Sequence, residues 1–169
     1  MSYFPGRGID LSITGNENRV VVDASAAIDL FAGRDRARIE AAEKVFMCFK
    51  ARSGRVKVFA PRLFLAEVSG VLARFLPPSR VRSVVHRLES EIVTVGDDLY
   101  FKESVEVALR TGSRGADSYY IGLAEILNAI LITSDRVQAL NAKRAGVQAY
   151  YALEEVGTIL KHLGCQQPS

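Results

Sequence analysis

The sequence predicts an α/β fold with a mainly parallel sheet flanked by helices on both faces, and three observations favour it. Short apolar runs rich in β-branched residues alternate with longer stretches of helical periodicity. The 169 residues suit one domain, since no linker, internal repeat or low-complexity segment divides them. A composition of 49% hydrophobic and 24% charged residues is that of a chain with a buried core.

The first half of the chain begins with residues 1–18, which are rich in Gly, Ser, Thr and Asn and predict a flexible N-terminal extension. The β-branched run after them predicts a buried strand. Proline closes the second strand, and a Pro-Pro pair stops the third helix. We expect strands at 19–23 and 56–60 and helices at 25–33, 37–52, 63–76 and 79–88, the last capped by Ser79.

The second half of the domain continues the same alternation, with glycines where its elements end. Gly96 ends a strand, whereas Gly112 and Gly146 each end a helix. We expect strands at 92–95, 129–133 and 147–150 and helices at 98–110, 117–127, 136–144 and 153–163. The domain therefore spans residues 19–164, and residues 165–169 form a C-terminal tail.

Several classes of protein are disfavoured by the residues present. The apolar runs are far shorter than the ~20 residues of a membrane span, and the N-terminus lacks a signal-peptide pattern, so a cytoplasmic protein is expected. Cys48 and Cys165 lie far apart and outside any CxxC motif, which favours two free thiols over a disulfide or a zinc site. His86 and His162 are isolated, and no nearby Ser or Cys fits the arrangement of a catalytic triad, which argues against chemistry that rests on histidine.

Acidic residues stand where an α/β sheet binds ligands, at the carboxyl ends of its strands. Asp23 ends the first strand, and Asp135 follows the fourth strand with one residue between. Asp117 opens the helix that leads into that fourth strand, and Glu67 lies inside an apolar helical segment. We refer to Asp23, Glu67, Asp117 and Asp135 as the four carboxylates, and we expect them to converge at one edge of the sheet.

Taken singly, each of the four carboxylates has an ordinary structural alternative. The three aspartates are suited to cap the helices that follow them, a role worth about 1 kcal/mol each. Glu67 is suited to an exposed helix face or to an ion pair with Arg62 or Arg74. As a set they would repel one another by roughly 4 kcal/mol per pair at about 4 Å and a dielectric constant near 20. Such a cluster needs protons or a cation, and oxygen ligands select Mg²⁺ or Mn²⁺, the usual ions of phosphodiester hydrolysis.

Four short segments in order resemble the motifs of the PIN-domain family, most closely those of VapC-type toxin ribonucleases. Residues 20–25 resemble the opening strand, and residues 61–68 resemble the helix with an embedded glutamate. Residues 117–124 resemble the motif in which an aspartate opens a helix, and residues 132–135 resemble the strand that ends in Thr-x-Asp. The resemblance extends over nearly the whole chain, from about residue 19 to residue 163.

The resemblance implies a five-stranded, mainly parallel sheet and a Mg²⁺- or Mn²⁺-dependent endoribonuclease. The four carboxylates would be catalytic and would bind the metal directly or through water. Thr133 would supply an accessory hydroxyl, and Ser25 would help to position a ligand. The resemblance also implies a homodimer and an antitoxin protein that blocks the site. VapC-type toxins often begin almost at the first strand, so the residues that precede Arg19 depart from that pattern.

Basic and aromatic residues near the motifs are candidates for RNA contacts. The net charge is +3, and setting the four carboxylates aside leaves 15 acidic against 22 basic residues, a balance of +7 that suits a polyanion. Arg114 and Arg136 adjoin the motifs and are candidate phosphate ligands, although solvated surface arginines fit equally well. Tyr119 and Tyr120 are candidates for stacking on a base, with a core role expected for at least one of them.

Other functions than that of a nuclease are also compatible with the sequence. The first is a non-catalytic PIN-like scaffold that binds RNA or a protein. The second is a haloacid-dehalogenase-like phosphatase with Asp23 as nucleophile, but Ser25 stands where that family needs a second aspartate. A dinucleotide-binding domain is disfavoured, since no GxGxxG follows the first strand. The RNA substrate, the number of metals, the antitoxin, the role of residues 1–18 and the choice between toxin and RNA-processing roles stay open.

Overall fold

The computed structural model describes residues 18–165, which form a five-stranded sheet whose strands all pair in parallel. The strand order is β3-β2-β1-β4-β5, which places β1 at the centre. The strands are β1 (Asn18–Val22), β2 (Val56–Pro61), β3 (Val93–Val95), β4 (Ile130–Thr133) and β5 (Ala149–Tyr151). The predicted fold class is confirmed. The predictions for residues 1–17 and 166–169 lie outside the described residues.

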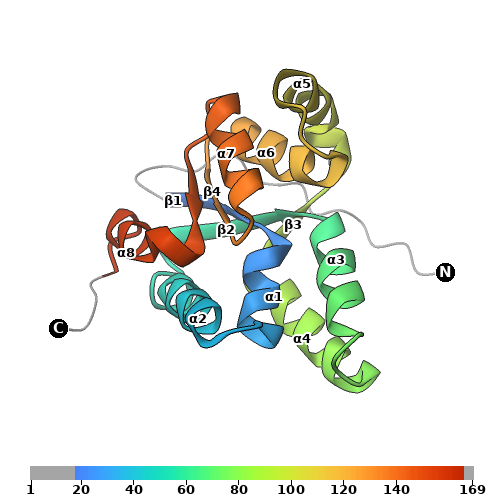
Figure 1. Cartoon of the computed structure of the whole chain (residues 1–169), viewed down its shortest axis with the longest axis vertical. Helices are drawn as coiled ribbons and strands as arrows, with labels where there is room; N and C mark the ends of the chain where they lie inside the picture. Colours follow the sequence, from blue (N-terminus) through green and yellow to red (C-terminus); the bar gives the residue numbers. More distant parts are fainter. Residues whose placement is uncertain (1–17, 166–169) are drawn as a thin grey trace.

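Helices cover both faces of this sheet (Figure 1). Helices α1 to α4 lie on one face, with α8 packed against α2, and α5, α6 and α7 lie on the other. The helices are α1 (Ala24–Ala32), α2 (Arg36–Ala51), α3 (Leu63–Leu72), α4 (Pro78–Glu91), α5 (Phe101–Thr111), α6 (Gly115–Leu127), α7 (Arg136–Ala145) and α8 (Ala152–His162), with a 3₁₀ turn η1 (Asp97–Leu99) before α5.

The central strands carry uninterrupted apolar runs, residues 20–22 in β1 and 130–132 in β4, because helices cover both faces of the sheet there. Val20, Val21 and Val22 of β1 are completely buried, as are Leu131 and Ile132 of β4. Such continuous apolar strands are typical of parallel sheets. In a sheet with one solvent-exposed face, apolar and polar residues alternate along each strand instead. The carboxyl ends of β1 and β4 therefore lie side by side at one edge of the sheet.

Several element boundaries differ from the predictions: α3 ends at Leu72 rather than at residue 76, α6 begins at Gly115 rather than at residue 117, and two further differences have local reasons. Helix α4 begins at Pro78 with Pro77 as its N-cap, so Ser79 does not cap it. The fixed φ angle of proline suits the first turn of a helix, where its missing N–H is not needed. The helix predicted at 98–110 is divided into η1 and α5, because Tyr100 takes a non-helical conformation between them.

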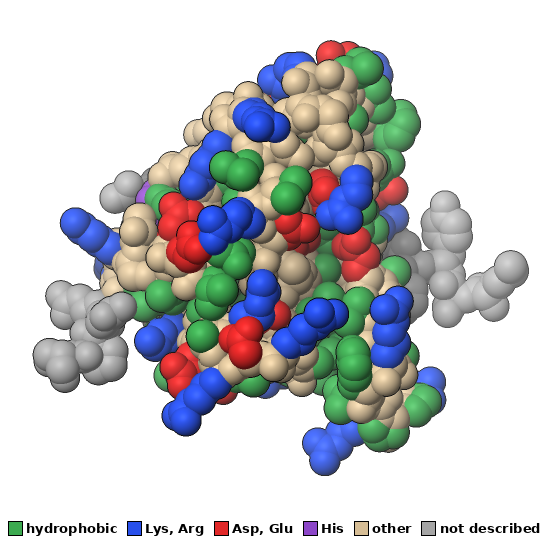
Figure 2. All heavy atoms as spheres, viewed as in Figure 1, with side chains coloured by type: hydrophobic (Ala, Val, Ile, Leu, Met, Phe, Trp, Pro, Cys, Tyr) green, Lys and Arg blue, Asp and Glu red, His purple; other side chains and the backbone are tan. Residues whose placement is uncertain are grey.

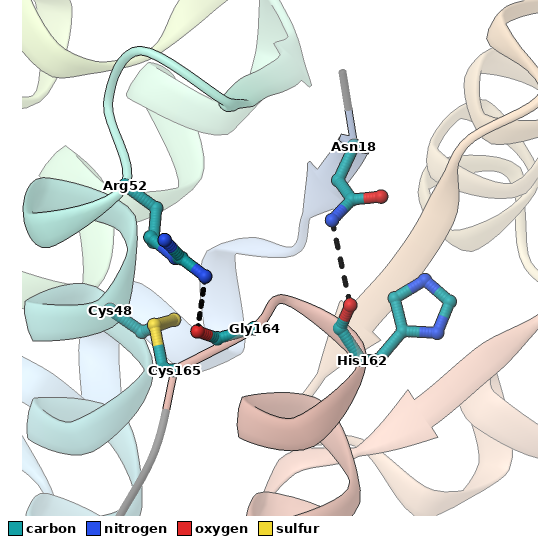
Figure 3. Close-up of a disulfide and its surroundings, with 6 residues drawn as sticks. All are labelled: Asn18, Cys48, Arg52, His162, Gly164 and Cys165. Atoms are coloured by element: carbon teal, nitrogen blue, oxygen red, sulfur yellow. Dashed lines mark hydrogen bonds between the residues drawn. A yellow bond between two sulfur atoms is a disulfide. The ribbon is translucent and has the colours of Figure 1, made fainter. Parts of the chain in front are cut away.

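A disulfide joins Cys48 of α2 to Cys165, so the prediction of two free thiols is wrong. The two Cα atoms lie 5.9 Å apart, although the residues are separated by 117 positions in the sequence. Figure 3 shows two further contacts around this bond, from Arg52 to the carbonyl of Gly164 and from the Asn18 amide to the carbonyl of His162. Since Asn18 begins β1, the disulfide lies near the amino edge of the sheet.

None of the helices within residues 18–165 combines the length and the apolar character needed to span a membrane.

Candidate active site

The four carboxylates line one pocket of about 380 Å³ at the carboxyl edge of β1 and β4. They arrive from different parts of the fold: Asp23 from the β1–α1 junction, Glu67 from α3, Asp117 from α6 and Asp135 from the β4–α7 junction. Further residues of the lining are Ser25, Arg74, Arg114 and Gln138. In Figure 2, acidic side chains gather between α7 and α3, with basic side chains close beside them. The structure therefore brings together the residues whose convergence the sequence predicted.

Asp23 is buried, with 7% of its surface exposed, and caps helix α1. Its Oδ2 accepts hydrogen bonds from the Ser25 backbone N–H at 3.1 Å, from the Ser25 hydroxyl and from Thr133 Oγ1 at 3.0 Å. Burial raises the pKa of Asp23, and the hydrogen bonds from Ser25 and Thr133 partly oppose that rise. The capping role considered from the sequence and a place in the pocket thus hold for the same side chain.

Asp135 divides its two oxygens between a cap and the pocket. Its Oδ1 caps α7 by accepting from the backbone N–H groups of Val137 at 2.8 Å and Gln138 at 3.2 Å. Its Oδ2 lies 3.2 Å from Nη2 of Arg114. The cap therefore fixes the carboxylate and leaves the second oxygen to a cationic partner.

Asp117 is not a helix cap, because α6 begins at Gly115 with Arg114 as its N-cap residue. It lies in the first turn of α6, where the helix dipole favours a negative charge. Arg114 Nε donates to its Oδ2 at 3.0 Å. Arg114 thus bridges Asp117 and Asp135, and it acts as a counter-ion to two of the four carboxylates.

Glu67 accepts a hydrogen bond on Oε2 from the Tyr120 hydroxyl at 2.5 Å. Burial raises the pKa of Glu67, the bond from Tyr120 opposes this, and the charges of Asp23 and Asp117 raise it further. In the described part of the chain, Glu67 forms no ion pair with Arg62 or Arg74, the partners considered from the sequence. Its side chain is directed to the pocket instead.

The other candidate residues have more varied positions. Thr133 is fully buried and donates to Asp23, whereas Arg136 pairs with Glu154 and lies over the ring of Tyr151 at 5.2 Å. Arg136 is not among the residues that line the pocket. Tyr120 is 1% exposed and therefore inaccessible to a base. Tyr119 is half-buried against the rings of Tyr100 and Phe101.

Sequence reasoning missed Gln138, which lines the pocket and is 1% exposed. Its Oε1 lies 2.6 Å from Thr133 Oγ1, whose single proton thus faces two acceptors, Gln138 and Asp23. Its Nε2 is buried without a hydrogen-bond partner among the described residues. The sequence feature that could have identified Gln138 is its position three residues after Asp135, on the buried side of α7.

The donor chemistry of the pocket fits a hard divalent cation, because carboxylate oxygens are the ligands that Mg²⁺ and Mn²⁺ prefer. The arrangement is not a formed coordination sphere, however. Across residues 18–165, no group of three or more His, Cys, Asp or Glu side chains is placed to hold a metal ion. Arg114 instead forms ion pairs with two of the four carboxylates, Asp117 and Asp135.

Solved structures with a similar fold include proteins from three organisms. The crystal structure of PAE2754 from Pyrobaculum aerophilum has a TM-score of 0.59 and 23% identity, covering 88% of this chain and 91% of that one. The crystal structure of FitAcB from Neisseria gonorrhoeae has a TM-score of 0.58 and 13% identity, over 80% of this chain and 99% of that one. A toxin-antitoxin complex from Klebsiella pneumoniae has a TM-score of 0.51 and 18% identity, over 69% and 86%. At these identities the likeness shows a shared fold.

Of the two sequence comparisons, the one with family models identifies the family, whereas the one with curated proteins finds no match. The family model of the PIN domain matches residues 20–144, a segment that contains the four carboxylates. Since that segment is well over half of the chain, this protein belongs to the PIN-domain family.

Proposed function

We propose that this protein is a metal-dependent endoribonuclease that hydrolyses RNA phosphodiester bonds and serves as the toxin of a toxin–antitoxin pair. The observation that carries the proposal is the meeting of the four carboxylates in one pocket. PIN domains are generally nucleases, and carboxylates that share a pocket repel one another unless a cation or protons neutralise them. The four carboxylates are the proposed ligands of Mg²⁺ or Mn²⁺.

The hydrogen bonds of the pocket suit this role, because three of the four carboxylates have one oxygen fixed by protein donors. Ser25 and Thr133 hold Oδ2 of Asp23, the α7 cap holds Oδ1 of Asp135, and Tyr120 holds Oε2 of Glu67. The opposite oxygen of Asp23 and of Glu67 is left for a ligand, whereas Oδ2 of Asp135 already contacts Arg114, which a metal ion would have to displace. A divalent cation, when bound, lowers the pKa of a water and neutralises charge on the phosphate.

Basic side chains around the pocket supply the contacts proposed for RNA. Arg74 lines the pocket, and the side chain of Arg114 is 74% exposed. Arg114 is bound to carboxylates, so a phosphate would compete with Asp117 and Asp135 for its guanidinium. Arg136 is the weaker candidate, since Glu154 already pairs with it.

The proposal includes a homodimer and an antitoxin partner. Phe101, Val105 and Leu109 are 51%, 42% and 75% exposed and recur every four residues, so they share one face of α5. We propose a homodimer with this apolar face as part of its contact, and light scattering of the purified protein tests whether the dimer exists. The Klebsiella structure of similar fold is a toxin-antitoxin complex, which supports an antitoxin partner, and the proposal is that this partner covers the pocket.

A cytoplasmic location is part of the same proposal, because a cellular RNA substrate is found there. Disulfides are rare in the cytosol of mesophiles and frequent in hyperthermophiles. The Cys48–Cys165 bond is therefore compatible with a cytoplasmic location in a hyperthermophilic cell. Fractionation of the native cells tests it.

One observation favours a second candidate, a non-catalytic scaffold. Arg114 neutralises Asp117 and Asp135 without a metal, so the pocket is able to persist as a purely structural feature. A scaffold would bind RNA or protein and would not need Mn²⁺. The same experiment distinguishes it from the nuclease.

The test is cleavage of a mixed RNA pool by the wild type and by Asp117→Asn, each with EDTA, Mg²⁺ or Mn²⁺. We expect cutting only with metal, and a loss of at least about a hundredfold in the variant, because metal-assisted stabilisation is worth several kcal/mol and ~1.4 kcal/mol is tenfold. Asp98→Asn is the matched control, since Asp98 is exposed and lies outside the pocket lining. Circular dichroism verifies that all three proteins are folded.

Equal cutting by wild type and Asp117→Asn would show that the activity lies elsewhere. If neither protein cuts, calorimetric titration of the wild type with Mn²⁺ decides between the two candidates. Binding of Mn²⁺ would indicate a nuclease that lacks its RNA in the pool. Absence of binding would favour the scaffold.

A further inference from the structure

Tyr120 is a buried polar residue beside the pocket whose hydroxyl has a specific partner. Its ring lies in α6 and is 1% exposed, and its hydroxyl donates to Glu67 Oε2 at 2.5 Å. The two residues are 53 positions apart and belong to helices on opposite faces of the sheet. Burial and the nearby charges of Asp23 and Glu67 raise the pKa of Tyr120, so the hydroxyl keeps its proton at neutral pH.

Glu67 is the one long side chain among the four carboxylates, and it needs this support more than the others do. A glutamate loses up to about 1.5–2 kcal/mol of rotamer entropy when it is fixed. Asp23 and Asp135 are fixed by helix caps, whereas within residues 18–165 the hydrogen bond that holds the Glu67 carboxylate comes from Tyr120. A rigid aromatic ring in a packed core is a suitable fixed point.

The position of Tyr120 also links two of the proposed ligands. Asp117 and Tyr120 are three residues apart on α6, a spacing that brings side chains to the same helix face. A single helix therefore carries one carboxylate and the support of another. Any movement of α6 changes both.

We propose that Tyr120 is a positioning residue that fixes Oε2 of Glu67 and thereby leaves Oε1 to a divalent cation. This inference rests on the proposed metal-dependent function. Tyr120 does not touch RNA in this role, because its ring is buried and its proton is engaged. Outer partners that orient a metal ligand typically change metal affinity by about 10–100-fold when they are removed.

The test compares Tyr120→Phe with Tyr119→Phe in calorimetric titrations of the full chain with Mn²⁺. Both substitutions remove one hydroxyl from neighbouring positions of α6, but Tyr119 packs through its ring against Tyr100 and Phe101. We expect Mn²⁺ affinity to fall about tenfold or more in Tyr120→Phe and to stay within about twofold in Tyr119→Phe. Thermal melting verifies that both variants are folded.

A double-mutant cycle with Glu67→Gln distinguishes positioning from general loosening of the core. If Tyr120 acts through Glu67, adding Tyr120→Phe to Glu67→Gln weakens Mn²⁺ binding no further. An equal loss in both backgrounds, or wild-type affinity in folded Tyr120→Phe, would overturn the inference. A wild type that binds no Mn²⁺ would overturn the proposed function and this inference with it. A wild type that binds Mn²⁺ but cuts no RNA would leave the variant comparison decisive for Tyr120.

Discussion

At the carboxyl edge of the sheet, four acidic side chains share one pocket, whereas at the amino edge a disulfide and hydrogen bonds to chain carbonyls join α2, α8 and the start of β1. The first arrangement includes a carboxylate whose pKa is raised by burial, which means that the fold makes its charge unfavourable. The second contains a covalent bond that closes a loop of more than a hundred residues. The chain thus concentrates a destabilising group at one edge and a stabilising one at the other.

This difference teaches that stability and the proposed chemistry are separable along the strands. Substitutions at the amino edge are expected to change the free energy of unfolding and leave cleavage unaffected. Substitutions at the carboxyl edge are expected to change metal binding and cleavage, while some of them stabilise the fold. Three variants test this separation, in order of decreasing effect.

The largest change in the free energy of unfolding is expected for Cys165→Ser, which removes the disulfide. Closing a loop of this length restricts the unfolded chain by about 4–5 kcal/mol in the chain-entropy model. Denaturant unfolding under oxidising conditions should show most of that loss, with RNA cleavage at 25 °C unchanged. With a reducing agent, the wild type and the variant should unfold alike. Loss of cleavage in the folded variant would contradict the separation of the two edges.

A smaller change, a gain in the free energy of unfolding, is expected for Asp23→Asn in metal-free buffer. Burial raises the pKa of Asp23, so its contribution to stability is greatest below the unfolded value near 4 and is lost as pH rises through the raised value. Asparagine keeps the helix cap without the charge. We expect the variant to be more stable at pH 7 by about 1 kcal/mol, or ~2–4 °C in melting temperature, and inactive. The gain should shrink towards pH 4, and a gain that does not depend on pH would show that charge is not its cause.

The smallest change is expected for Arg114→Gln, as a modest shift in Mn²⁺ and RNA affinity. This substitution removes the counter-ion from Asp117 and Asp135. An exposed ion pair is worth up to about 1 kcal/mol, so Mn²⁺ affinity should rise by no more than about fivefold. RNA affinity should fall and depend less steeply on salt, because one phosphate contact is lost. Arg136→Gln is the control, since Arg136 pairs with Glu154 outside the pocket lining. Equal changes in both variants would indicate a general charge effect.

The sequence by itself determined the parts of this protein that depend on local pattern. The alternation of β-branched runs with helical periods predicted the parallel α/β sheet, since each element is specified by its own residues. The ends of β1 and β4 placed Asp23 and Asp135 at one edge, because parallel strands share a direction. Gly112 and Gly146 end α5 and α7 in the left-handed conformation that favours glycine.

Only the tertiary structure decided which side chains meet across elements. The bond from Tyr120 to Glu67, the disulfide and the buried position of Gln138 depend on how helices distant in sequence pack on the sheet. A hydrophobic period tells which face of a helix is buried, but it does not name the partner on that face. The two cysteines show this most clearly, because only the contact of α2 with α8 brings residues 117 positions apart within the reach of a disulfide.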